Sequence, residues 1–162
     1  MYNVLFICTA NICRTPIAVS ILQKLINDDG LQDRIVVESA GTWAVPGQCA
    51  APFSEQVILE NGYPFVDHES RPIDLSTMNR ADLVLCMSIE HRYDLTNIFP
   101  HFRDKIFTLR EFQQNNLKGS RSVLDPFGMK VEKYRETFEL IRSEVERIWP
   151  TIKSRSQLQK VS

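Results

Sequence analysis

The sequence lacks any apolar run that approaches the ~18–20 residues of a membrane-spanning helix. Its first ten residues, MYNVLFICTA, have neither the basic start nor the cleavage site of a signal peptide. The sequence also lacks a surplus of positive charge, because it has 19 Lys and Arg and 20 Asp and Glu. Nucleic-acid binders are normally basic. We therefore expect no membrane and no nucleic acid as partner, and a cytoplasmic location in which the four cysteines stay reduced.

The length of 162 residues lies within the ~100–200 typical of one domain. We assign residues 1–152 to a single domain and interpret residues 153–162, which are polar and lack periodicity, as a frayed tail. Histidine is scarce, and the three histidines show no metal-ligand spacing. The sequence therefore predicts neither a metal nor a cofactor.

Short β-branched runs alternate with longer helical stretches, which is typical of an α/β fold with a parallel sheet. We predict strands at residues 2–8, 34–39, 82–87 and 105–109, and helices at 16–28, 54–60, 88–98 and 131–149. Right-handed connections then predict a three-layer sandwich, with a four-stranded parallel sheet in the order 2-1-3-4 and helices on both faces. In such sheets ligands bind beyond the carboxyl ends of the strands, where the loop after the first strand lies.

That loop reads CTANICRTP from Cys8 to Pro16, so five residues separate a cysteine from an arginine at a helix start. The backbone N–H groups of the loop and of the helix N-terminus, for which Thr15 is the expected cap, can surround one tetrahedral oxyanion. Arg14 offers a planar pair of donors to two phosphate oxygens. Cys8 would lie in the same positive field, which stabilises a nucleophilic thiolate, and Thr15 would donate a hydrogen bond to it. The substrate-binding residues expected in the loop are Thr9, Ala10, Asn11, Ile12, Cys13 and Thr15.

These residues resemble the low-molecular-weight protein tyrosine phosphatases of bacterial type, whose loop is Cys-x5-Arg-Ser/Thr-Pro at the extreme N-terminus. The likeness covers residues 2–149 and includes ESAG at 38–41, ADLVLCM at 81–87 and the late Asp-Pro at 125–126. Family members usually have Gly where this chain has Ala10, and commonly Ser where it has Thr15. Either Ala10 therefore adopts a backbone conformation that a Cβ tolerates, or the loop is slightly strained.

Asp125 is the candidate proton donor. Displacing an alkoxide or phenoxide from phosphorus needs a general acid at the leaving oxygen. An Asp-Pro pair alone predicts only a turn, but the resemblance places the family's general acid in this motif. Trp43 and Phe127 match aromatic residues of two family loops, and we expect them to hold a flat phosphotyrosine ring.

Other residues are expected to support the loop. Asn11 suits a left-handed backbone position, and by resemblance it bonds to Ser39. The His-x-x-Arg motif at residues 68–71 resembles a family feature of structural value. Cys13 is either filler or the partner of Cys8 in a reversible disulfide that protects the nucleophile from irreversible oxidation.

The expected function is therefore that of a metal-free protein tyrosine phosphatase acting through a phosphocysteine. Cys8 is the nucleophile, Arg14 binds the phosphate, and Asp125 is general acid and then general base. The expected partner is a phosphotyrosine-containing protein, and weak self-association stays open.

Three alternative functions are weighed against it. Residues 103–109 and 123–128 look closest to the protein-arginine phosphatases of the same family, but those enzymes carry Thr where this chain has Ile12. A thioredoxin-coupled arsenate reductase normally has a close cysteine pair after the third strand, where Cys86 stands alone. Sugar-transport phosphocarrier domains also phosphorylate a cysteine after the first strand, but they lack an arginine six residues later.

Overall fold

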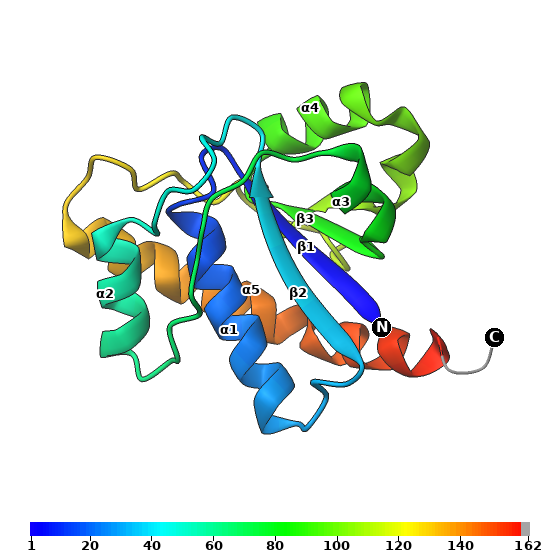
Figure 1. Ribbon diagram of the computed structural model, residues 1–162, viewed down its shortest axis with the longest axis horizontal. Coiled ribbons are helices and arrows are strands. Elements are labelled where there is room, and N and C mark those ends of the chain that lie inside the picture. The colour runs from blue at the N-terminus through cyan, green and yellow to red at the C-terminus, as the bar shows by residue number, and fades with distance from the viewer. Residues whose placement is uncertain (160–162) are drawn as a thin grey trace.

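The computed structural model describes residues 1–159, and Figure 1 shows a central sheet between two layers of helices. The four strands are β1 (Tyr2–Cys8), β2 (Ile35–Gly41), β3 (Leu83–Cys86) and β4 (Ile106–Thr108). They are parallel and ordered β2-β1-β3-β4, which confirms the predicted fold class and strand order. Because β1 is central and pairs Cys8 with Gly41 of β2, the loop after β1 begins beside the end of β2.

Both faces of the sheet are covered because β1 is apolar on both of its faces. On one face Val4 and Phe6 belong to a core shared with α1 (Arg14–Asp28), α2 (Pro52–Glu60) and α5 (Val131–Leu158). On the other face Leu5 and Ile7 belong to a second core. That core is closed by α3 (Leu75–Arg80), α4 (Ile89–Ile98) and the 3-10 helix η1 (Pro100–Lys105). No helix within residues 1–159 is long and apolar enough to cross a membrane.

The last helix is longer than the sequence pattern predicts. We expected it to end at residue 149 and residues 153–162 to form a frayed tail, but α5 continues to Leu158. The extension has its own contacts, because Ile152 is fully buried and Lys153 forms an ion pair with Asp29 at 2.9 Å. Pro150 is tolerated inside the helix because it lies on the exposed side, where a carbonyl that loses its helical partner can bond to water. Residues 160–162 of the expected tail lie outside the described residues.

Helix α3 was absent from the sequence prediction. It begins after Asp74, whose carboxylate accepts a hydrogen bond from the backbone N–H of Thr77 at 2.7 Å. A capping Asp of this kind is a usable sequence signal, but the six-residue helix is too short to show an apolar period.

Candidate active site

The cavity that contains the predicted nucleophile has a volume of about 320 Å³ and lies at the carboxyl edge of the sheet. Its lining residues are Cys8, Thr9, Ala10, Ile12, Cys13, Arg14, Gln48, Asp125 and Phe127. The structure thus brings most of the predicted site residues together, from segments more than one hundred residues apart. Gln48 was missed, since nothing in its surrounding sequence marks it. Asn11 and Thr15 are fully buried and lie outside this lining.

The shape of the loop depends on the Asn11 side chain. Asn11 has a φ of 60°, which confirms the predicted left-handed position, whereas Ala10 keeps a negative φ that suits its Cβ. The Asn11 amide nitrogen donates to Thr15 Oγ1 at 2.8 Å and to Ser39 Oγ at 2.9 Å, and the Ser39 bond is the one expected by resemblance. Its amide oxygen accepts from the backbone N–H of Arg71 at 3.0 Å. The His68 ring is also hydrogen-bonded to the Asn11 carbonyl. Residues 68–71 therefore support the loop structurally.

The end of β2 approaches the loop so closely that only glycine fits there. A Cβ on Gly41 would clash with the carbonyl oxygen of Thr9. The next two residues are bonded to the loop, since the N–H of Thr42 donates to the Cys8 carbonyl at 3.0 Å and the N–H of Trp43 donates to the Thr9 carbonyl at 2.9 Å. β2 therefore fixes the loop backbone at the point where it leaves β1.

Thr15 contacts the candidate nucleophile as expected but does not cap the helix. Its Oγ1 lies 3.3 Å from Cys8 Sγ. Because that oxygen accepts from the amide of Asn11, the hydroxyl hydrogen remains for the sulfur. Helix α1 begins at Arg14, one residue before Thr15, and Cys13 at the cap position makes no side-chain capping bond. Among the described residues no acceptor takes the backbone N–H groups of residues 10–13, so the loop and the helix start can serve an anion.

Arg14 is buried, with 4% of its surface exposed. Its Nη1 donates to the carbonyl of Val123 at 2.9 Å, and its Nη2 lies 3.4 Å from Thr9 Oγ1 and 3.5 Å from Asp125 Oδ2. The remaining donor, Nε, is buried and contacts no acceptor within the described chain. A buried guanidinium with an unused donor beside a cavity is suited to a tetrahedral oxyanion.

The loop that carries Asp125 is anchored to the sheet two residues earlier. The N–H of Val123 donates to the carbonyl of Met87, which follows β3, at 2.6 Å. The Asp125 side chain is 46% exposed, and its Oδ1 accepts from the backbone N–H of Phe127 at 3.1 Å. The other carboxylate oxygen, Oδ2, faces Arg14. From this position Asp125 can exchange a proton with a group in the cavity.

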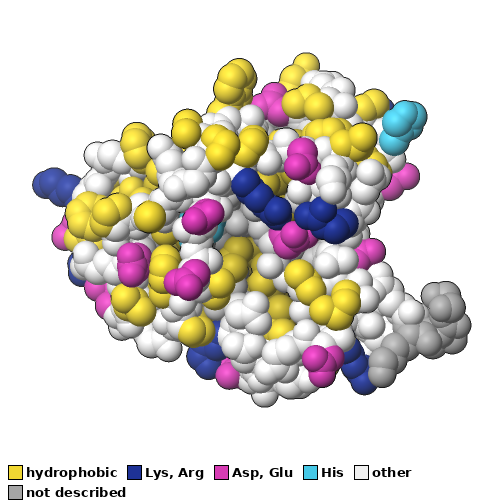
Figure 2. Space-filling model, viewed as in Figure 1, with side chains coloured by type: hydrophobic (Ala, Val, Ile, Leu, Met, Phe, Trp, Pro, Cys, Tyr) yellow, Lys and Arg dark blue, Asp and Glu magenta, His cyan; other side chains and the backbone are white. Residues whose placement is uncertain are grey.

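The predicted pair of aromatic walls is only half present in this cavity. Phe127 lines it, but Trp43 is 80% exposed and lines a neighbouring hollow of about 620 Å³. The two spaces share Thr9, Arg14 and Asp125. Figure 2 shows hydrophobic side chains gathered along the upper edge of the molecule, the edge to which the strands point in Figure 1. Trp43 thus stands beside the cavity rather than in it.

His91 is a residue of this site that the sequence analysis missed. It lies in the first turn of α4, is 4% exposed, and its Nε2 is 2.8 Å from Thr9 Oγ1. Its Nδ1 is 2.9 Å from Ser88 Oγ. Burial and the neighbouring Arg14 lower the pKa of His91 to about 4, so the ring is neutral near neutral pH. A Ser-x-x-His pattern at a helix start carries no recognisable functional signal, because it is common as simple capping.

The other cysteines differ in their surroundings. Burial raises the pKa of the Cys13 thiol to about 11, and Tyr134 Oη lies 3.6 Å from its sulfur. Burial in β3 also raises the pKa of Cys86, which has no exposed surface. Burial thus disfavours the thiolate form of both cysteines near neutral pH.

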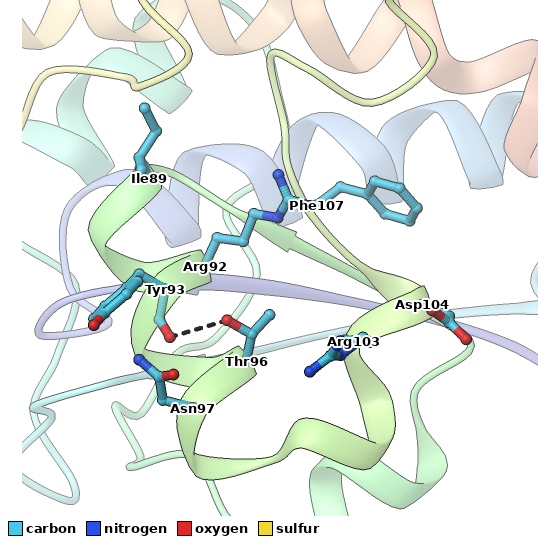
Figure 3. Close-up of a pocket in the computed structure, with 8 residues that line it drawn as sticks. All are labelled: Ile89, Arg92, Tyr93, Thr96, Asn97, Arg103, Asp104 and Phe107. Carbon is cyan, nitrogen blue, oxygen red and sulfur yellow. Dashed lines mark hydrogen bonds between the residues drawn. The ribbon is translucent and has the colours of Figure 1, made fainter.

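A larger surface groove of about 610 Å³ lies over α4 and η1. Figure 3 shows Arg92 and Arg103 directed into it and the hydroxyl of Thr96 bonded to the carbonyl of Tyr93 at 3.0 Å. No cysteine or histidine is among the described residues that line the groove. Within residues 1–159 no cluster of three His, Cys, Asp or Glu side chains is placed to hold a metal ion.

Comparisons with known proteins agree with this geometry. Residues 3–159 match the family described as low molecular weight phosphotyrosine protein phosphatase. The chain is 35% identical to the protein-arginine-phosphatase of Bacillus subtilis (83% of this chain, 86% of the relative) and 33% identical to the low molecular weight protein-tyrosine-phosphatase of Streptomyces coelicolor (88% of each). Its fold matches a Cys-to-Ser mutant of the YwlE arginine phosphatase with a phosphorylated active-site serine (TM-score 0.85, 31% identity, 93% and 95% coverage). The chain therefore belongs to the low-molecular-weight protein tyrosine phosphatase family of hydrolases.

Proposed function

We propose that the protein hydrolyses phosphotyrosine in protein substrates through a phosphocysteine formed on Cys8, without a metal or cofactor. In the first step the Cys8 thiolate attacks phosphorus, an S–P bond forms, and the bond from phosphorus to the phenolic oxygen breaks. The Asp125 carboxyl transfers its proton to the departing phenolate. Arg14 and the loop N–H groups stabilise the charge on the other phosphoryl oxygens.

In the second step a water molecule attacks the phosphocysteine. The Asp125 carboxylate takes a proton from this water, the S–P bond breaks, and the products are inorganic phosphate and the Cys8 thiolate. The hydrogen bond from Thr15 stabilises that thiolate as the leaving group. Cys8 and Asp125 take part in both steps, and Asp125 acts first as general acid and then as general base.

One observation carries the proposal: Cys8, Arg14 and Asp125 line a single cavity, and the buried Arg14 Nε has no acceptor within residues 1–159. The mutant YwlE structure, with phosphate on the serine that replaces its cysteine, supports the same role for Cys8. Hydrolysis of para-nitrophenyl phosphate in the presence of a chelator, and its inhibition by vanadate, tests the activity. No turnover by the folded protein under these conditions would contradict it.

The walls of the cavity support a phenyl ring as the leaving group. Ile12 and Phe127 present apolar surface there. A phosphoguanidinium would leave N–H donors without partners against Ile12, at a cost of ~1–3 kcal/mol.

Phosphoarginine is the second candidate substrate, and two observations favour it. Protein-arginine-phosphatases are among the relatives, and Gln48 and Asp125 add polar groups to the cavity. We rank phosphoarginine second because this chain has Ile12 at the position where the protein-arginine phosphatases carry Thr.

Kinetics on matched phosphotyrosine and phosphoarginine peptides separate the two substrates. We expect kcat/KM to favour phosphotyrosine by at least ~10-fold, equivalent to ~1.4 kcal/mol. Ile12→Thr should shift the ratio toward phosphoarginine, because its hydroxyl can pair with the guanidinium, while Ile12→Val is the matched apolar control. A wild-type preference for phosphoarginine would overturn the substrate assignment and leave the phosphatase mechanism intact.

The two remaining alternatives fit the structure less well. An arsenate reductase needs a relay of accessible thiols, but Cys86 is fully buried in β3. A phosphocarrier must protect its phosphocysteine from water, whereas Asp125 is half-exposed beside the nucleophile and suited to activating water.

Mild peroxide is expected to inactivate the enzyme reversibly. Peroxide oxidises the Cys8 thiolate to a sulfenic acid, and the Cys13 thiol then displaces water to form a disulfide. Because burial raises the pKa of Cys13 to about 11, the disulfide should form faster as the pH increases from 7 toward 9. Peptide mass spectrometry should find the Cys8–Cys13 link, and thiol reductant should restore activity. Cys8 recovered as sulfonic acid with Cys13 still free would exclude the protective role.

A further inference from the structure

The Arg14 guanidinium is held from two sides, and the two anchors differ in rigidity. The Val123 carbonyl that receives Nη1 belongs to a backbone segment bonded to Met87 after β3. The other anchor is the side-chain oxygen of Thr9, 3.4 Å from Nη2. A threonine side chain on a partly exposed loop can rotate about χ1 between staggered positions. The orientation of the guanidinium plane therefore depends on what fixes the Thr9 rotamer.

His91 is the group placed to fix it. Its Nε2 contacts Thr9 Oγ1 at 2.8 Å, across 82 positions of sequence, and its Nδ1 is held by Ser88 at 2.9 Å. Ser88 is in turn the N-cap residue of α4 and is itself buried. In either neutral tautomer the Thr9 oxygen keeps a lone pair for Nη2 of Arg14. A chain of contacts thus runs from the start of α4 through Thr9 to the phosphate-binding arginine.

The charge state of His91 suits this position. The charged groups around its ring are Arg14 of α1, Glu90 of α4 and Asp125 of the loop before α5. Because the ring is buried and neutral near neutral pH, it holds Thr9 without placing a second cation beside Arg14. A lysine or arginine there would repel the guanidinium and compete for the anion.

We propose that His91 is a positioning residue that holds the Thr9 hydroxyl and, through it, orients the Arg14 guanidinium to bind the phosphoryl group. The inference rests on the phosphatase function but not on the choice between phosphotyrosine and phosphoarginine. The affinity for inorganic phosphate, measured by calorimetry, depends on the orientation of Arg14 and requires no turnover. The kcat/KM for para-nitrophenyl phosphate tests whether the same orientation of Arg14 matters for the reaction.

The experiment is a double-mutant cycle between His91→Leu and Thr9→Val. Each single change should weaken phosphate affinity and lower kcat/KM by about 10–100-fold, the usual effect of losing a hydrogen bond to a charged group. The double variant should be no worse than Thr9→Val within about twofold, because both changes remove one chain of contacts. His91→Gln, whose amide can still reach Thr9, should recover part of the loss. His101→Leu, at an exposed histidine of η1, is the matched control and should change nothing.

Thermal unfolding identifies variants that fail to fold, and His91→Asn, which is polar but too short to reach Thr9, replaces His91→Leu in the cycle if needed. Phosphate affinity within about twofold of wild type in the folded His91 variant would overturn the proposal. Losses that multiply in the double variant would also overturn it, because a merely structural role of His91 does not depend on the Thr9 hydroxyl. A wild-type protein that bound phosphate but showed no turnover would contradict the proposed function. The double-mutant cycle measured by phosphate affinity would still decide the role of His91.

Discussion

Replacing Cys8 by Ser is expected to lower turnover of any phosphomonoester by at least ~10³-fold, because an alcohol offers almost no anion near neutral pH. The fold should be unaffected, since Cys8 is buried at the end of β1 and serine is nearly the same size. Phosphate should still bind, because Arg14 and the loop N–H groups are unchanged. A serine that does attack would trap the phosphoryl group, visible as a mass increase of one phosphoryl on the intact protein.

Three measurements check this result. Steady-state kinetics give the loss of turnover, calorimetry gives phosphate affinity, and thermal unfolding confirms the fold. Cys49→Ser is the matched control, because Cys49 is exposed and outside the cavity, and it should keep full activity. A Cys8→Ser variant that kept a tenth of the wild-type rate would show that another group is the nucleophile.

Asp125→Asn should lower kcat by ~10²–10⁴-fold, the usual contribution of a positioned general acid. The amide keeps the size of the side chain and can still accept the N–H of Phe127, so the loop should stay in place. The loss should be large for phenyl phosphate and small for para-nitrophenyl phosphate, because nitrophenolate departs without a proton.

A series of aryl phosphates with leaving groups of graded pKa checks this prediction. In the wild type the rate should depend weakly on leaving-group pKa, and in Asp125→Asn it should depend steeply. Asp104→Asn, at the groove of Figure 3, is the control and should leave both the rate and the dependence unchanged. An equal loss across the series would mean that Asp125 only supports the loop.

Local sequence determined a large part of the fold and of the site. The almost continuous apolar run at Tyr2–Cys8 is typical of a strand covered on both faces, and it forms an inner strand of the sheet. The five residues between Cys8 and Arg14, with Asn11 at a left-handed position, form the loop that is predicted to bind an anion, because backbone geometry over so short a distance has few solutions. Strand order followed from the handedness of parallel connections. These features depend on neighbours in the chain, and for that reason a single sequence predicts them.

The tertiary structure decided how distant groups meet at this loop, and the sequence had indicated Asp125 and Ser39 only through the family resemblance. His91 contacts Thr9 because β1 and β3 are adjacent, so that α4 starts beside the loop. Asp125 reaches Arg14 because Val123 is bonded to Met87. Trp43 lies outside the cavity because the end of β2 is hydrogen-bonded to the loop backbone. Helix α5 continues past residue 149 because Ile152 packs in the core. Each of these depends on contacts between segments far apart in sequence, which leave no periodicity or spacing in the chain itself.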